Sequence, residues 1–260
     1  MIDAFVPQVS TFAADIDNVI NTVGVIVGFW FFLSLGAFFF LCWKYRYREG
    51  VPTQYVDGSN PKHKRFISWP HNIILLCDVL LIVVAVRVWV NVKQTLPDPS
   101  KGTVEYVRII AQQWAWSFQY PGADGKFDTS DDVKTVDELH VSVNTNVQFE
   151  LMSRDVLHSF SVPVFRLKQD AIPGRVVTGW FNAKNTGTYD LQCVEICGLA
   201  HGIMFAKVII ETPEQREQWL KAHAPAVPVV ASAAPAAPAA PAAPAAASPE
   251  PAPATPAPVR

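Results

Sequence analysis

Two long runs of apolar residues dominate the first 95 positions of the chain. Residues 19–43 contain no charged side chain, and residues 72–92 contain only Asp78 and Arg87. About 20 consecutive apolar residues are enough for a helix to cross the hydrocarbon core of a bilayer. We therefore expect residues 1–95 to form an N-terminal segment and a transmembrane helical hairpin in the lipid bilayer, with spans at about 19–43 and 72–92.

The two charged residues of the second run have different expected environments. Arg87 lies near the end of the run, where its long side chain can reach the polar boundary of the membrane. Asp78 lies deeper, and a carboxyl group at that depth is costly unless it faces protein or water. Two explanations remain open for Asp78: a contact between helices in a larger bundle, or a proton-relevant group facing a partner subunit.

Charges outside the runs predict the orientation of the hairpin. The segment before the first run contains no Lys or Arg, whereas the loop between the runs contains six basic residues: Lys44, Arg46, Arg48, Lys62, Lys64 and Arg65. Basic loops remain on the cytoplasmic side of a membrane. Both termini and the rest of the chain are therefore expected outside the cytoplasm, in the periplasm if the membrane is a bacterial inner membrane.

After residue 95 the pattern changes to short runs typical of β-strands. These runs are separated by turn signals such as Pro121-Gly122 and Pro173-Gly174. Strands without intervening helices favour an all-β sandwich or Greek-key barrel. We expect residues 96–225 to form this domain. Its predicted strands cover residues 104–120, 139–143, 147–152, 176–181, 188–192 and 205–210.

Two segments at the end of the chain are not strands. Residues 213–222 are expected to form a short helix, because Thr212 can cap it and Pro213 fits its first position. Residues 226–260 consist mostly of Ala and Pro, a composition that buries too little surface to fold, so a disordered tail is expected. The formal net charge of -2 gives no indication of a nucleic-acid partner.

Four metal-binding side chains lie within twelve residues just after the strand expected at 188–192. They are Cys193, Cys197, His201 and Met204. Thiolate, imidazole and thioether form a soft donor set, which favours copper over magnesium, calcium or manganese. A disulfide between the two cysteines would close a very short loop, and zinc would leave Met204 unexplained.

Two cysteines can also bridge a pair of copper ions through both sulfurs. A mononuclear blue-copper site needs only one cysteine, whereas a bridged pair needs a histidine on each copper. His201 supplies one of them. His158, in the segment Asp155-Val156-Leu157-His158-Ser159-Phe160 between expected strands, is the best candidate for the other, although a lone histidine near a strand is more often structural.

These residues also resemble a known family. The run Cys193-Val194-Glu195-Ile196-Cys197 with His201 and Met204 looks like the dinuclear copper (CuA) loop of cytochrome c oxidase subunit II. Three further segments resemble the same family in the same order: residues 113–118, 155–160 and 168–175. The resemblance covers roughly residues 17–221 and implies a cupredoxin-like Greek-key sandwich behind the two-helix hairpin.

The resemblance implies a ligand set and several neighbouring roles. Cys193 and Cys197 would bridge both coppers, His158 and Met204 would complete one, and His201 with the backbone carbonyl of Glu195 the other. The Glu195 side chain would bind a magnesium ion shared with subunit I. Trp114 would be the residue through which electrons arrive, whereas Trp116 is expected in the core. Asp170 and Arg175 would lie near the haem propionates and the proton exit, unless they form an ordinary surface salt bridge.

The implied function is that of an electron-transfer subunit. It would accept electrons from reduced cytochrome c and pass them to haem in subunit I, where oxygen is reduced to water and protons are pumped. The chain has no Cys-x-x-Cys-His sequence, so no covalent haem is expected. The family's acidic residue before the second span is missing, since residues 62–69 contain no carboxylate. We therefore consider Asp78 as a replacement.

Residues 122–132 form an acidic, Gly-bearing segment with two interpretations. It partly resembles a calcium loop but lacks the EF-hand spacing, so a solvated hairpin loop is the simpler interpretation. Together with Asp155 its charge could form an acidic docking face for a basic cytochrome.

Three other functions compete with the oxidase interpretation. A quinol oxidase subunit would keep the fold without copper. A copper subunit of a nitric oxide or nitrous oxide reductase would keep the metal centre. A zinc or disulfide-stabilised binding module would not explain Met204.

Overall fold

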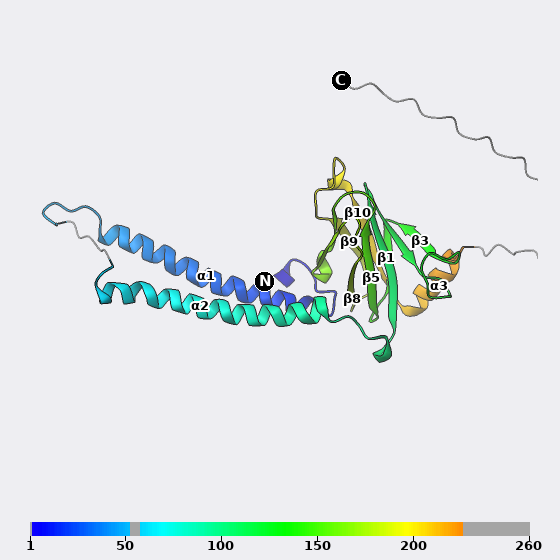
Figure 1. The fold of residues 1–260 in the computed structure, drawn as a ribbon, viewed down its shortest axis with the longest axis horizontal. Coiled ribbons are helices and arrows are strands. Elements are labelled where there is room, and N and C mark those ends of the chain that lie inside the picture. Colours follow the sequence, from blue (N-terminus) through cyan, green and yellow to red (C-terminus); the bar gives the residue numbers. More distant parts are fainter. Residues whose placement is uncertain (1, 53–57, 226–260) are drawn as a thin grey trace, which may run out of the picture. The chain divides into compact units, whose positions relative to one another are not determined.

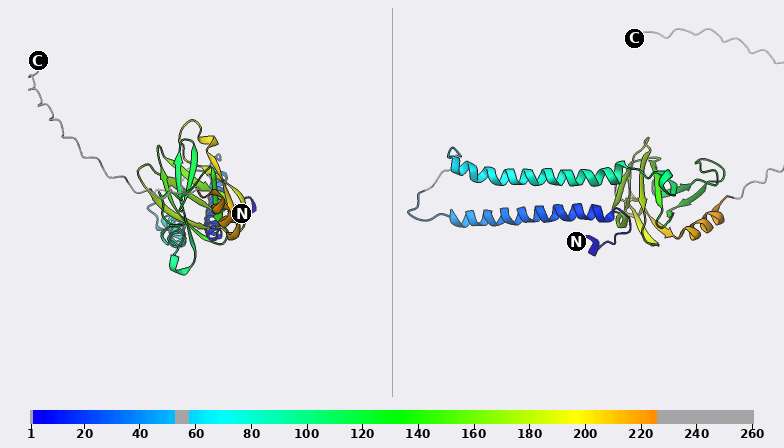
Figure 2. Two further views of the ribbon diagram at one scale, coloured as in Figure 1. Left: turned by 90° about the vertical axis from the view of Figure 1, so that its right-hand side faces the viewer. Right: turned by 90° about the horizontal axis from the view of Figure 1, so that it is seen from below.

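The computed structural model describes residues 2–52 and 58–225, without the side chains of Ile2 and His63. Its first two long elements are helix α1, which spans Ala13–Lys44, and helix α2, which spans Pro61–Trp89. The two helices lie side by side and run in opposite directions (Figures 1 and 2). The hairpin predicted from the apolar runs is confirmed, while the tail expected at 226–260 falls outside the described residues.

The ends of α2 follow from its sequence. Asn60 caps the helix by accepting a hydrogen bond from the Lys62 N–H, and Pro61 occupies the first turn, where its missing N–H costs nothing. At the other end the helix continues as a π-helical turn over Val90–Gln94. The helical segment is therefore longer than the span predicted from hydropathy alone.

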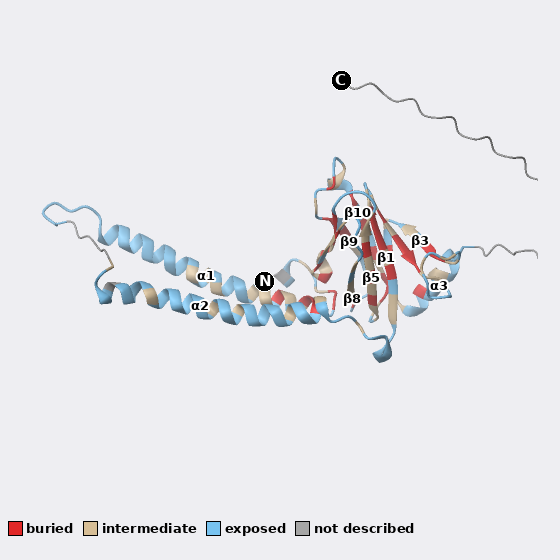
Figure 3. Ribbon diagram, viewed as in Figure 1, coloured by how far each residue is buried: buried red, intermediate tan, exposed pale blue. Residues whose placement is uncertain are grey.

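Both helices expose their apolar side chains along most of their length (Figure 3). The segments Ala13–Lys44 and Lys64–Gln94 are long and apolar enough to cross a membrane. Continuous apolar surface of this size marks an interaction with lipid or with other protein.

In the described part of the chain, ten strands form two five-stranded sheets. One sheet has the order β3-β2-β1-β5-β8 and the other β4-β10-β9-β6-β7. Most neighbours are antiparallel, but β1 pairs with β5 and β4 with β10 in parallel. The strand bounds are β1 Val104–Gln112, β2 Ala115–Tyr120, β3 Val133–Val136, β4 Glu138–Ser142, β5 Asn146–Ser153, β6 His158–Val162, β7 Leu167–Ala171, β8 Val177–Asn182, β9 Gly187–Cys193 and β10 Phe205–Glu211. The predicted fold class, a two-helix hairpin followed by a β-sandwich, is confirmed.

The hydrophobic core lies between the two sheets. The largest fully buried side chains come from both of them and include Trp116, Phe118, Phe149, Phe160 and Phe181. The Trp116 ring packs edge-on against Phe160, with ring centroids 5.7 Å apart. Trp116 is thus a core residue, as the sequence predicted.

Two local features differ from the expected elements. The run expected at 104–120 is a hairpin, β1 and β2, with Gln113 and Trp114 at its turn. The strands β3, β6 and β7 were not predicted, because they are short and carry many polar residues. The terminal helix α3, Pro213–His223, agrees with the prediction, and Thr212 and Gln215 form a reciprocal capping box at its start.

Candidate metal centre

Two neighbouring strands bring the distant donor residues together. His158 is the first residue of β6 and Cys193 is the last residue of β9. These strands pair antiparallel with Phe160 opposite Cys193, so the two donors reach the same end of the sheet. A hydrogen bond from the Cys193 N–H to the Met204 carbonyl closes the loop between β9 and β10, and one from the Val194 N–H to the Ser159 carbonyl joins this loop to β6. Both are 3.1 Å long.

The donor atoms form one compact cluster. The sulfur atoms of Cys193 and Cys197 are 3.8 Å apart. His158 Nδ1 lies 4.0 Å from the Cys193 sulfur, and His201 Nδ1 lies 3.5 Å from the Cys197 sulfur. The Met204 sulfur is 3.8 Å from that of Cys197, and the Glu195 carbonyl oxygen is 3.3 Å from that of Cys193. The structure therefore brings all six predicted donors together.

These separations fit ligands around metal ions. Two ligands bound tetrahedrally at 2.0–2.3 Å are about 3.5 Å apart, close to the observed spacing. A disulfide requires sulfur atoms about 2.05 Å apart, and both cysteines are free. The spacing of the two sulfur atoms therefore fits thiolate ligands around a metal ion and not a disulfide.

Burial controls the chemistry of the thiols. Cys193, Cys197, His158 and Met204 are all buried. Burial, with the neighbouring Cys193 thiol, raises the pKa of the Cys197 thiol to about 11. Since the thiolate is the form that binds a metal, metal uptake must release thiol protons.

Asp155 orients His158. Its carboxylate lies 2.8 Å from His158 Nε2, so Nδ1 faces the sulfur atoms. It also accepts hydrogen bonds from the N–H groups of Gln113 and Val156, each 2.7 Å long. Burial alone would raise the pKa of Asp155, but these hydrogen bonds outweigh it and lower the pKa. Carboxylates in this position fix the ring of a metal-binding histidine.

Trp114 lies directly against the metal-binding loop. Its indole N–H and the Gln113 side-chain amide both donate to the Cys197 carbonyl, at 3.3 and 2.7 Å. The ring remains 38% exposed. Gly198 permits this approach, because its φ is +121° and a Cβ there would come within 2.9 Å of the Gln113 amide.

Comparison with known proteins identifies the family. Residues 106–212 match the profile described as cytochrome c oxidase subunit II, periplasmic domain. The chain is 32% identical over 229 residues to the alternative cytochrome c oxidase subunit 2 of Bradyrhizobium diazoefficiens, and the match covers 79% of each protein. The chain belongs to the cytochrome c oxidase subunit II family.

Two other relatives of this subunit II chain match a shorter part of it. Identity to cytochrome c oxidase subunit 2 of Thermostichus vulcanus is 46% over 127 residues, 47% of this chain and 36% of that protein. A solved structure, the periplasmic domain of subunit II of cytochrome oxidase from Bradyrhizobium japonicum, is 31% identical to this chain in sequence. The match covers 46% of this chain and 92% of the chain in that structure, with a TM-score of 0.39.

Family membership and the cluster together indicate a copper centre. His158, Cys193 and Cys197 place their donor atoms within 4.8 Å of one another, and His201 and Met204 add the soft donors that favour copper. Membership together with the two apolar helices also identifies this subunit II as a membrane-anchored protein.

The remaining predicted site residues lie in different surroundings. Asp170 accepts a 2.8 Å hydrogen bond from the hydroxyl of Ser159, the residue after His158. Arg175 is exposed, and its side chain forms no ion pair with any residue that the structure describes. Asp78 is exposed on the surface of α2. The Glu195 side chain is half-buried in the metal-binding loop.

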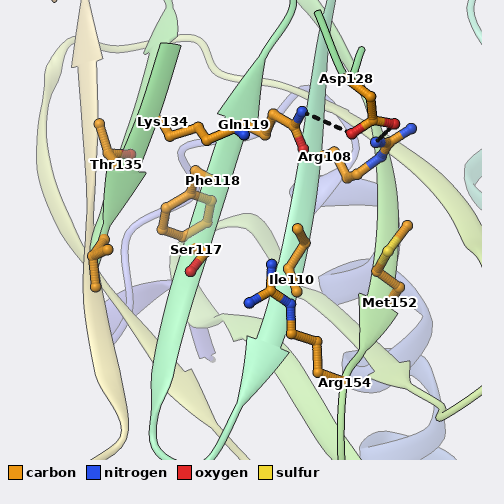
Figure 4. A pocket seen from close by; sticks show the side chains of 11 residues that line it. Arg108, Ile110, Ser117, Phe118, Gln119, Asp128, Lys134, Thr135, Met152 and Arg154 are labelled. Carbon is orange, nitrogen blue, oxygen red and sulfur yellow. Dashed lines mark hydrogen bonds and ion pairs between the residues drawn. The ribbon is translucent and has the colours of Figure 1, made fainter. Parts of the chain in front are cut away.

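The acidic segment at 122–132 lies beside a separate pocket on the outer face of the first sheet (Figure 4). Asp128 lies 2.7 Å from Arg108, which also binds Glu150 at 2.9 Å. Asp128 also accepts a hydrogen bond from Gln119. None of the residues lining this pocket is a predicted copper ligand. The acidic residue that lines it, Asp128, is bound to these protein donors.

Sequence reasoning missed the contacts of Asp155 and Gln113. Asp155 stands three residues before His158, a spacing that lets a loop carboxylate reach the ring, and this signal was present in the sequence. The contact of Gln113 with Cys197 joins residues 84 positions apart, and no local pattern predicts it.

Proposed function

We propose that this chain is subunit II of a haem-copper cytochrome c oxidase, and that its six donors bind a dinuclear copper centre. The observation that supports this proposal most directly is the pair of free cysteine sulfurs, which lie 3.8 Å apart with a histidine beside each. Cys193 and Cys197 would hold both ions, His158 and Met204 would complete one, and His201 with the Glu195 carbonyl would complete the other. A copper-free subunit or a zinc site would leave this set of soft donors unexplained.

The residues of the chain make the centre suitable for electron transfer. A thiolate-bridged copper pair supplies a site that takes up and releases one electron with little change in geometry. The protein holds the ligands in place beforehand, since His158 is fixed by Asp155 and the loop is fixed by its backbone hydrogen bonds. Cys193, Cys197 and Met204 are at most 8% exposed, so their sulfur atoms have little contact with water.

Trp114 is the proposed route for incoming electrons. Its ring is partly exposed on one side and hydrogen-bonded to the Cys197 carbonyl on the other, so it joins the surface to a copper ligand. Reduced cytochrome c is the proposed donor, and haem in subunit I is the proposed acceptor for oxygen reduction and proton pumping. Acidic residues including Asp155 and those of the segment 122–132 suit a basic donor.

Other residues extend the proposal to subunit I. The carboxylate of Glu195 would bind a magnesium ion at the subunit I interface, and Asp170 and Arg175 would lie toward the haem propionates and the proton exit. Asp78 is the proposed proton-relevant group within the membrane. The copper domain and both termini are proposed to lie on the periplasmic side of a bacterial inner membrane, which the basic residues around the turn between α1 and α2 support.

Rapid mixing of the copper-loaded full chain with reduced cytochrome c tests this function. The expected result is oxidation of the cytochrome and bleaching of the copper absorption, with both signals lost in C197S. W114F should slow the reaction without changing the copper spectrum. W180F, on strand β8, is the matched control and should match the unsubstituted chain. Unchanged rates in W114F would remove Trp114 from the route, and no cytochrome oxidation by the loaded chain would refute the function.

A further inference from the structure

A buried arginine ties helix α1 to the β-domain. Arg166 lies between β6 and β7, next to the short 3-10 turn Pro163–Phe165. Its guanidinium binds both carboxylate oxygens of Asp17, a residue of α1, at 2.7 and 2.8 Å. It also donates to the carbonyl oxygens of Val6, Pro7 and Pro163. Both charged side chains are almost completely buried.

The backbone of Arg166 shows that this contact is specifically built. Its φ is +57°, in the left-handed region that glycine adopts freely and that is unfavourable for other residues. The contacts of the guanidinium offset this unfavourable conformation. Glycine would fit the turn itself better, but it would leave the buried Asp17 carboxylate without its charged partner and with the neutral Gln8 amide, 2.7 Å away, which is strongly destabilising.

Helix α2 is tied to the same pair of strands. Lys93, in the π-helical turn that ends α2, donates to the Lys168 carbonyl at 3.1 Å and to the Gln169 side chain at 3.2 Å. Both acceptors belong to β7. Each membrane helix therefore contacts the β6–β7 hairpin directly, one at its turn and the other along its second strand.

The β6–β7 hairpin also carries a metal ligand. His158 begins β6 and pairs with Ala171 at the end of β7. The next pair, Ser159 and Asp170, is joined across the strands by a side-chain hydrogen bond of 2.8 Å. The hairpin thus has Arg166 at its closed end and the copper ligand His158 at its open end, connected by five paired positions.

We propose that the β6–β7 hairpin is the joint through which both membrane helices hold the copper site in position, with Arg166 and Lys93 as positioning residues. The inference rests on the proposed function, because the fixed quantity is the distance from the copper site to an electron acceptor in another subunit. Electron transfer between protein sites slows steeply as this distance grows. Loosening the joint should slow transfer without altering the copper ligands.

Hydrogen exchange in the assembled oxidase tests the joint itself. R166G and D17N remove the buried ion pair, K93M removes the second tie, and N144G is the matched control, since Asn144 is an exposed residue with φ +55°. The reporter amides are those of Val9, Thr11 and Lys184, which bond between the N-terminal segment and the domain. In R166G these three amides should exchange about 100-fold faster, while the Val143 amide should exchange at its original rate. In N144G all of these amides should exchange at their original rates. D17N should act in the same direction.

Turnover with cytochrome c tests the positioning role. R166G should lower kcat with KM and the copper EPR spectrum unchanged, K93M should have a smaller effect, and R166K should restore part of kcat by returning the charge. If the three amides exchange at unchanged rates in R166G, the inference that Arg166 joins helix α1 to the domain is wrong. Faster exchange with unchanged kcat would overturn its positioning role. The exchange rates do not depend on copper, so these outcomes are separable from failure of the proposed function.

Discussion

Replacing Asp155 by alanine removes the carboxylate that holds the His158 ring in its metal-binding orientation. The carboxylate lies 2.8 Å from His158 Nε2, and the ring is fully buried, so the orientation of the ring depends on this contact. The Gln113 N–H, 2.7 Å from the same carboxylate, loses its partner as well. The Asp155 carboxylate therefore fixes both the turn that holds Trp114 and the ring of the copper ligand His158.

The size of the effect follows from one hydrogen bond to a charged group. Such a bond contributes about 1.5–3 kcal/mol, and about 1.4 kcal/mol corresponds to a tenfold change in affinity. D155A should therefore weaken copper binding about 10- to 150-fold. This agrees with the 10–100-fold that is typical of carboxylates behind metal-binding histidines. D155N keeps a neutral acceptor and should lose only about 1 kcal/mol, or roughly fivefold.

Competition titration against a copper chelator, followed by the absorption of the bound copper in the full chain, measures this change. D190N is the matched control, since Asp190 is an exposed carboxylate on β9 that pairs with Lys207, and its affinity should equal that of the unsubstituted chain. Equal affinities for D155A and D190N would refute the orienting role of Asp155.

Trp116→Ala should lower the free energy of unfolding by about 3–5 kcal/mol, measured by chemical denaturation followed by circular dichroism, because the ring is fully buried against Phe160. Thr212→Ala removes the side-chain acceptor of the Gln215 N–H and should cost about 1 kcal/mol, seen as faster amide exchange in α3. The hydrogen bond from Arg108 lowers the pKa of Asp128. A carboxyl group with a lowered folded-state pKa stabilises above its ordinary value of about 3.9 and loses this effect as the pH falls through the lowered pKa. The protection of amides in the 122–132 loop against exchange should therefore fall in that acidic range. R108M should remove the part due to Asp128 and leave the part due to Asp131 and Asp132, whose pKa values are also lowered.

The sequence was sufficient for features that depend on local patterns. The two spans follow from continuous apolar runs, and α3 follows from Thr212 and Pro213. The donors Cys193, Cys197, His201 and Met204 lie close together in the chain, so their chemistry was evident before their geometry. Their spacing alone could not select His158, which entered through the resemblance of its segment.

Features that depend on distant pairing were not predictable in the same way. β7 reads Leu-Lys-Gln-Asp-Ala and shows no strand-like alternation, since it becomes a strand by pairing with β6. The break between β1 and β2 at Gln113 depends on contacts with Asp155 and Cys197. The Asp17–Arg166 pair joins residues 149 positions apart, and an arginine in a turn carries no local sign of a buried partner.

The EPR spectrum of the copper-loaded full chain tests the dinuclear copper centre most directly. One unpaired electron shared equally by two copper nuclei should give a hyperfine pattern characteristic of both nuclei, accompanied by two copper ions per chain in elemental analysis. C193S and C197S should each abolish this pattern, because either substitution removes a bridge. A hyperfine pattern from a single copper nucleus, or no signal from the loaded chain, would contradict the dinuclear centre.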